Sequence, residues 1–302
     1  MSLDADGLLD RRRLKRRIAF WRTLAIIASV AVVAVAVDRY SGIGDRDRVA
    51  RLDVVGVIVE DHDRDEALAE VAEDDRAKAL IVRIDSPGGT TAGGEALYTA
   101  LRHVAEEKPV VAVLGTLGAS GGYMAAVAAD HIIARETTIT GSIGVLLQTA
   151  EITGLLEKLG ISTETIKSAP LKAVPSPFEE LTDEARVATQ AVVDATHQWF
   201  VALVAERREL ALEVAASLAD GRVYTGRQAL ENDLIDALGG EREARAWLEE
   251  VHEVSSDLPV VDLEFGDDRK VIKDLFSILT GKTFLSERLI LDGLVSVWHP
   301  EG

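Results

Sequence analysis

Two short runs of small residues, each after an apolar strand, contain the residues of this chain that could do chemistry. Ser120 stands in the run Leu117–Tyr123, between the apolar segment 110–114 and an alanine-rich segment. A turn from strand to helix exposes such a hydroxyl, and the helix N-terminus offers N–H groups to a developing oxyanion. Gly88 and Gly89 end another apolar strand, where bare N–H groups can face a substrate carbonyl. Each run alone is also typical of an ordinary turn, but together they favour a hydrolase.

A serine nucleophile needs a base, and the sequence offers histidines and one lysine. The six histidines are His62, His103, His131, His197, His252 and His299. None lies in a turn that the expected strands place beside Ser120, and no pair has the spacing of metal ligands. Lys172 stands among apolar residues in the proline-rich loop 166–177, where desolvation would lower its pKa and let it accept the serine proton. The alternative for Lys172 is a solvated loop charge, which spacing alone favours.

The segments that must position these residues alternate between strand and helix. Strands are expected at 52–59, 79–84, 110–114 and 131–134, and helices at 64–74, 94–106 and 121–129. This alternation predicts an α/β fold of repeated βαβ units around a mostly parallel sheet that is buried on both faces. Thr182 is expected to cap a long helix that runs to about Leu210.

The N-terminal residues are expected to form one transmembrane helix. Six basic side chains among residues 1–17 precede the apolar stretch 18–37, which is about long enough to span a hydrocarbon layer of ~30 Å. Basic residues before the span place the N-terminus in the cytoplasm and the acidic body outside the cell membrane. A signal peptide that is cleaved near residues 34–36 is the alternative.

The chain therefore divides into five expected segments. They are a basic tail at 1–17, an anchor at 18–38, a linker at 39–50, a catalytic domain at 51–250 and an apolar, partly amphipathic tail at 251–302. The last segment is open to several interpretations, which include packing on the core, assembly, contact with a membrane and occupation of the substrate groove.

Composition limits the classes of partner. The 302 residues include no cysteine, which excludes disulfides and thiolate metal sites, and the formal charge of −18 argues against binding nucleic acid. Abundant acidic residues and scarce lysine are typical of a protein solvated in high salt. The hypothesis is a haloarchaeal source, and the alternative is an acidic protein from a GC-rich bacterium.

Four motifs in a fixed order resemble the signal peptide peptidase A family of Ser–Lys membrane peptidases. They are SPGG at 86–89, ASGGY at 119–123, TGSIGV at 140–145, and Lys172 followed by Ser176 and Pro177. The resemblance covers roughly residues 50–240 and implies a Clp-protease/crotonase-like fold. It implies that Ser120 is the nucleophile and Lys172 the general base, with the spacing of 52 residues that short bacterial members have.

The same resemblance implies roles for other residues and for partners. Ser142 would orient the lysine, and N–H groups of Gly88, Gly89 and Gly121 would form the oxyanion hole. Members of the family assemble into rings or domes, so a homo-oligomer is expected in which neighbouring protomers contribute the serine and the lysine of one site. Remnant signal peptides or other extended apolar peptides are the implied substrates, without a cofactor. The alternative function is a catalytically silent, membrane-anchored scaffold of the same fold.

Overall fold

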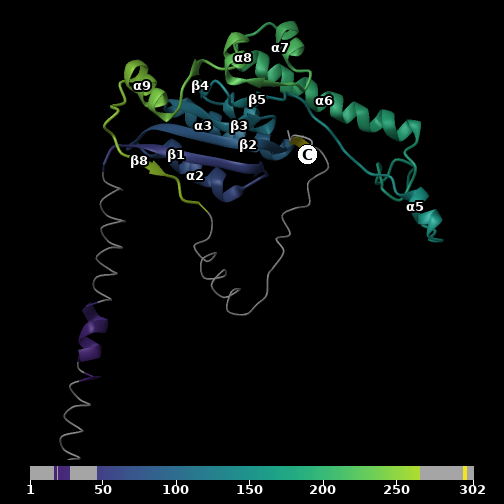
Figure 1. The fold of residues 1–302 in the computed structure, drawn as a ribbon, viewed down its shortest axis with the longest axis horizontal. Helices are drawn as coiled ribbons and strands as arrows, with labels where there is room; N and C mark the ends of the chain where they lie inside the picture. Colours follow the sequence, from purple (N-terminus) through teal and green to yellow (C-terminus); the bar gives the residue numbers. More distant parts are fainter. Residues whose placement is uncertain (1–16, 19, 28–45, 266–294, 298–302) are drawn as a thin grey trace, which may run out of the picture. The chain divides into compact units, whose positions relative to one another are not determined.

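The computed structural model describes residues 17, 18, 20–27, 46–265 and 295–297, and the chain separates into the units Met1–Asp47 and Arg48–Gly302 (Figure 1). In the first unit, residues 17, 18 and 20–27 are helical, and their side chains are exposed. No helix within the described residues has both the length and the apolar character needed to cross a membrane. Most of the expected anchor at 18–38, namely residues 19 and 28–38, lies outside the described part of the chain.

The second unit is built on a sheet of nine strands in its described residues, with the central order β6-β5-β3-β2-β1-β8. The strands are β1 (Arg48–Ile58), β2 (Ala77–Thr90), β3 (Val110–Ala119), β4 (His131–Ala134), β5 (Ile139–Gly141), β6 (Val223–Thr225), β7 (Ala237–Leu238), β8 (Val260–Asp262) and β9 (Val295–Val297). β5 with β6 and β2 with β9 are antiparallel, whereas the other pairs are parallel. The expected mostly parallel α/β sheet is confirmed.

Helices connect these strands. They are α2 (His62–Glu73), α3 (Thr91–Glu107), α4 (Gly121–Ala126), α5 (Thr153–Lys158), α6 (Asp183–Arg207), α7 (Leu212–Leu218), α8 (Gly226–Glu231) and α9 (Glu241–His252). The Thr182 hydroxyl accepts a hydrogen bond from Ala185 N–H at 3.2 Å, so the predicted cap of α6 is confirmed. The helix ends at Arg207 rather than near Leu210.

Alternate residues of the central strands pack against different helices. On β2, Leu80 and Val82 belong to a core cluster with α3 and α4 residues, whereas Ile81 lies in a second cluster with Ala244 and Leu248 of α9. Successive strand residues point to opposite faces of a sheet, so a continuous apolar run such as 80–82 is buried on both. This two-sided burial fixes the carboxyl ends of β2 and β3, where the candidate residues lie.

Three expected boundaries differ from the structure. β1 begins at Arg48, inside the expected linker 39–50, because the Arg48 guanidinium pairs with Asp74 at 2.5 Å and Val49 is buried. The fold continues past residue 250, since Val254 is buried and β8 pairs with β1. β2 does not end near residue 84 but continues as strand to Thr90.

Residues 144–199, called the arm below, lie largely outside the core. Ala185 is the only buried residue of this segment, whereas Ile143 before it and Phe200 after it are fully buried. The exposed large apolar side chains of the arm are Leu146, Leu155, Leu159, Ile161, Ile166, Leu171, Phe178, Val187 and Val192. Figure 1 shows α5 beyond the N-terminal end of α6, away from the sheet. Uncovered apolar surface of this extent is typical of an interface with another protein chain.

Candidate active site

Ser120 lies at the junction between β3 and α4, with a backbone conformation that few serines adopt. Its φ is 56° and its ψ is −119°, whereas residues other than glycine rarely have positive φ. Its N–H donates to the Gly141 carbonyl and its own carbonyl accepts from Met124 N–H, both at 2.8 Å. A strained serine in a sharp turn from strand to helix is the geometry of a nucleophile elbow. The predicted position of Ser120 in such a turn is confirmed.

The second glycine run lies next to this turn. β2 and β3 are parallel, with Ser86 opposite Gly118 near their carboxyl ends. A Cβ atom on Gly122 would come within 2.9 Å of the Ser86 carbonyl oxygen, so the start of α4 packs directly on β2. The fold therefore brings the two motifs together at one edge.

The glycines at 88 and 89 are required for different reasons. A Cβ atom on Gly89 would lie 1.7 Å from the Ile58 carbonyl oxygen, and Gly88 has a φ of 104°, which favours glycine. The Ser86 hydroxyl donates to the Gly56 carbonyl at 2.6 Å and accepts from Gly88 N–H at 3.0 Å. Since Gly88 N–H already has this internal acceptor, its expected part in an oxyanion hole is not supported.

Gly89 and Gly121 remain the candidate oxyanion donors. Gly121 is the first residue of α4, where N–H groups lack the carbonyl partner that helical residues find four positions earlier. Gly89 lies on the strand that packs against the start of α4.

Ser142 belongs to the same site. β5 runs beside β3 with Gly141 opposite Ala119, so Ser142 follows the residue that binds the Ser120 backbone. Ser142 is buried, has a φ of 49°, and donates its N–H to the Arg222 carbonyl at 2.8 Å. The structure thus fixes Ser142 close to Ser120 through strand pairing.

Lys172 lies on the arm, in the loop between α5 and α6, and Figure 1 shows this loop away from the sheet. Its side chain is exposed, so the apolar environment expected around it is absent within one chain. Within the part of the chain that the structure describes, the Lys172 side chain has no hydrogen-bond or ion-pair partner. By contrast, Lys167 is paired with Glu179, and this hydrogen bond lowers the pKa of the Glu179 carboxyl.

Two histidines have structural partners instead of catalytic ones. His131 lies opposite Val111, near the start of β3 and away from the end that leads to Ser120. Its ring stacks on Trp247 with a centroid distance of 4.6 Å. His197 Nε2 contacts the Ala219 carbonyl oxygen at 2.9 Å.

The His131 environment predicts a pH effect on stability. Burial lowers its pKa below the ordinary 6.5, and the nearby Asp236 opposes this shift only in part. A lowered pKa contributes stability that is present above pH 6.5 and lost as pH falls below that value. We expect His131→Gln to flatten the fall of the unfolding free energy as pH drops below 6.5, measured by urea denaturation. The control is His103→Gln, whose side chain is exposed, and equal slopes for both variants would contradict the prediction.

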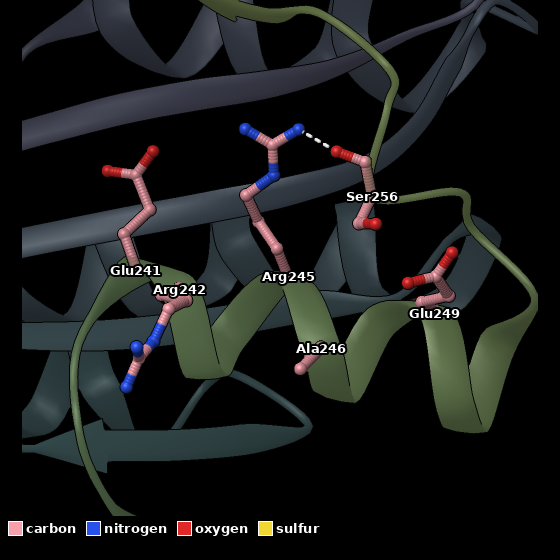
Figure 2. A pocket seen from close by; sticks show the side chains of 6 residues that line it. All are labelled: Glu241, Arg242, Arg245, Ala246, Glu249 and Ser256. Atoms are coloured by element: carbon pink, nitrogen blue, oxygen red, sulfur yellow. Dashed lines mark hydrogen bonds between the residues drawn. The ribbon is translucent and has the colours of Figure 1, made fainter.

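Figure 2 shows a pocket elsewhere, on α9, lined by Glu241, Arg242, Arg245, Ala246, Glu249 and Ser256. The Arg245 guanidinium donates to the carbonyls of Ser256 and Leu258, which holds the segment after α9. The helix packs on Ala79 and Val111 near the beginnings of β2 and β3. Because ligands of parallel α/β sheets bind at the carboxyl ends of the strands, this pocket is not part of the Ser120 site.

Among the residues that the structure describes, no cluster of three or more histidine, cysteine or acidic side chains could hold a metal ion. The Ser120 site offers a hydroxyl, backbone N–H groups and a second hydroxyl. It can support acyl transfer by a serine once a base is supplied.

Comparison with known proteins agrees with this chemistry. The model of peptidase family S49 matches residues 102–255. "Putative protease slr0021" of Synechocystis sp. is 43% identical over 203 residues, which are 67% of this chain and 73% of that protein. "Serine protease SPPA, chloroplastic" of Arabidopsis thaliana is 32% identical over 234 residues, which are 76% of this chain but 34% of that protein. Among solved structures, a membrane-bound stomatin-specific protease matches with a TM-score of 0.48 and 15% identity, over 72% of this chain and 98% of that chain.

Proposed function

The chain belongs to peptidase family S49 and is a serine peptidase, and from this premise we propose that Ser120 and Lys172 form its catalytic dyad. The observation that carries the proposal is the Ser120 turn, which places a strained serine beside the Gly88–Gly89 run and Ser142. The function is hydrolysis of peptide bonds within extended apolar peptides, such as remnant signal peptides.

The proposed reaction has two steps. Ser120 Oγ attacks the carbonyl carbon, its proton passes to the neutral Lys172 amine, and the N–H groups of Gly89 and Gly121 stabilise the oxyanion. The C–N bond then breaks, and Lys172 returns the proton to the leaving amine. In the second step Lys172 takes a proton from water and the hydroxide attacks the acyl-enzyme. The ester C–O bond then breaks, and Lys172 gives the proton to the leaving Ser120 oxygen. Ser142 is the proposed orienting residue for the lysine.

A second copy of the chain would complete the site. Lys172 lies on the arm, whose apolar side chains are uncovered and whose loop between α5 and α6 lies away from the sheet in one chain. We propose a homo-oligomer in which the arm of one protomer packs on its neighbour and brings Lys172 to the neighbour's Ser120. Burial at this interface would desolvate the lysine and favour its neutral form, which can accept the serine proton.

The surroundings of the site favour an apolar, extended substrate. Val57 lies opposite Gly88, and the side chains of Val55 and Val57 are 74% and 53% exposed. Exposed β-branched residues beside a strand end offer an apolar surface to a peptide that binds by strand addition. The basic segment 1–17 and the apolar stretch 18–37 support a proposed membrane anchor, with the catalytic domain on the extracytoplasmic side.

The substrate class can be tested with the full chain in lipid vesicles. We expect a peptide with a signal-sequence apolar core to be cleaved at least about tenfold faster than a length-matched peptide in which serines replace the leucines, because each lost apolar contact costs about 1 kcal/mol. Mass spectrometry of the products gives both rates, and Ser120→Ala is the blank. Equal rates for the two peptides would contradict the proposed substrate class.

A further inference from the structure

β2 contains a bulge directly before the two glycines of the candidate site. The register of the β1–β2 pair shifts at Gly56, which faces two residues of β2, Ser86 and Pro87. Gly56 has a φ of 77°, which favours glycine. A bulge bends its strand and changes the direction of the residues that follow. Here those residues are Gly88 and Gly89.

The Ser86 side chain makes hydrogen bonds that the main chain cannot make at this bulge. Pro87 has no N–H group to donate to β1. The Ser86 hydroxyl instead donates to the Gly56 carbonyl at 2.6 Å and accepts from Gly88 N–H at 3.0 Å. Because Ser86 is fully buried, water cannot take the place of this hydroxyl. One hydroxyl therefore links β1 to the residue that directly precedes the candidate donor Gly89.

The main chain of Ser86 contacts the other half of the candidate oxyanion hole. Ser86 lies opposite Gly118 of β3, two residues before the nucleophile. A Cβ atom on Gly122 would lie 2.9 Å from the Ser86 carbonyl oxygen and 3.3 Å from the Ser86 Cβ atom, so the start of α4 packs on Ser86. Gly122 directly follows Gly121, the second candidate donor. Ser86 thus contacts a neighbour of each donor.

We propose that Ser86 is a positioning residue, which fixes the N–H groups of Gly89 and Gly121 relative to one another. Donors of an oxyanion hole act only when they are held about 2.7–3.1 Å from the position of the oxyanion. Without the hydroxyl, the Gly56 carbonyl and the Gly88 N–H lose a buried partner, and we expect the end of β2 to shift until they regain hydrogen bonds. The assignment of the two donors rests on the proposed function.

The test compares the full chain carrying Ser86→Ala with the wild-type chain, both in lipid vesicles. We expect kcat for an apolar peptide to fall at least about tenfold while KM changes by less than about twofold, because the oxyanion forms only in the transition state. A peptide aldehyde forms an adduct with Ser120 whose oxygen occupies the hole, so its inhibition constant should rise by the factor by which kcat/KM falls. A mere loss of folded protein would leave the inhibition constant unchanged.

The matched control is Thr138→Val. The Thr138 hydroxyl is also buried, donates to the Gly115 carbonyl at 2.7 Å and accepts from Arg135 N–H at 3.0 Å. Its loss should lower stability but leave kcat and KM at the wild-type values. Ser86→Cys keeps a weak donor and acceptor, so its kcat should lie between those of Ser86→Ala and the wild-type chain, and it replaces the alanine variant if that variant does not fold. Unchanged kinetics for Ser86→Ala, or an equal loss of kcat for Thr138→Val, would overturn the proposal.

Amide hydrogen exchange separates this proposal from the proposed function. The Gly88 N–H should exchange faster in Ser86→Ala than in the wild-type chain, because its buried acceptor is lost. If no chain hydrolyses peptides, the proposed function fails, whereas faster exchange in Ser86→Ala but not in Thr138→Val still supports the positioning by Ser86. Equal exchange of the Gly88 N–H in all three chains would overturn the positioning and leave the peptidase activity intact.

Discussion

Ser120→Ala should abolish peptide hydrolysis and leave the fold intact, with a fall in kcat of at least about 10⁴-fold. The hydroxyl is the only group of residue 120 that can form the acyl-enzyme, whereas the backbone bonds to Gly141 and Met124 do not involve it. Alanine also keeps a Cβ atom, so the strain of the positive φ should change little. Rates on a fluorogenic apolar peptide and thermal unfolding curves give the two readouts.

The matched control for this prediction is Ser217→Ala. The Ser217 side chain is exposed on α7 and donates to the Val214 carbonyl of its own helix, at 2.7 Å. It should retain wild-type activity and a wild-type melting temperature. Hydrolysis by Ser120→Ala within tenfold of the wild-type rate would exclude Ser120 as the nucleophile.

Lys172→Ala should reduce kcat at least about 10³-fold, because the serine then has no positioned base. The Lys172 side chain makes no hydrogen bond or ion pair within the described residues, so its loss should leave the stability of the single chain unchanged. Lys158→Ala is the matched control, since Lys158 is also an exposed lysine of the arm. Wild-type hydrolysis by Lys172→Ala would contradict the dyad.

Mixed assemblies test whether the dyad is shared between protomers. When Ser120→Ala and Lys172→Ala chains are co-expressed in equal amounts, a site that joins the intact serine of one chain to the intact lysine of another is complete. With random mixing this combination occurs in about a quarter of the sites, so about a quarter of the wild-type activity should return. If both groups come from one chain, every site lacks one of them and no activity returns.

The local elements of this fold could be predicted from the sequence. The strand at 131–134 has the predicted bounds, since a short apolar run stands between Asp130 and Arg135. The start of α6 was predicted from Thr182, whose hydroxyl caps the helix. These features depend on neighbouring residues alone, so propensity and capping rules suffice to find them.

Features that depend on distant residues could not be predicted in this way. Pro87, Gly88 and Gly89 predict a turn, yet the chain stays extended there because β1 and β9 pair with it from both sides. The role of Ser86 was missed for the same reason, since its hydroxyl binds the Gly56 carbonyl thirty residues away. Its position before Pro-Gly-Gly was the only local signal.

The candidate site also combines residues that local sequence identifies with positions that depend on distant parts of the chain. Ser120 and the pair Gly88–Gly89 were identified from their small neighbours and from the apolar strands that precede them, whereas the role of Gly121 came from the family resemblance. The fold brings the two runs together at one edge. The sequence also predicts an apolar environment for Lys172, whereas its side chain is exposed in the single chain. The course of the arm that carries Lys172 depends on where α6 meets the core, at Phe200. No local pattern contains that information.

Labelling with a fluorophosphonate probe tests the central claim most directly, because the probe reacts only with an activated serine. The wild-type chain should be compared with Ser120→Ala and with Lys172→Ala in lipid vesicles. We expect labelling only of the wild-type chain, in which both Ser120 and Lys172 are intact. No labelling of the assembled wild-type chain would contradict the account and favour a catalytically silent scaffold, and labelling of Ser120→Ala would place the nucleophile elsewhere.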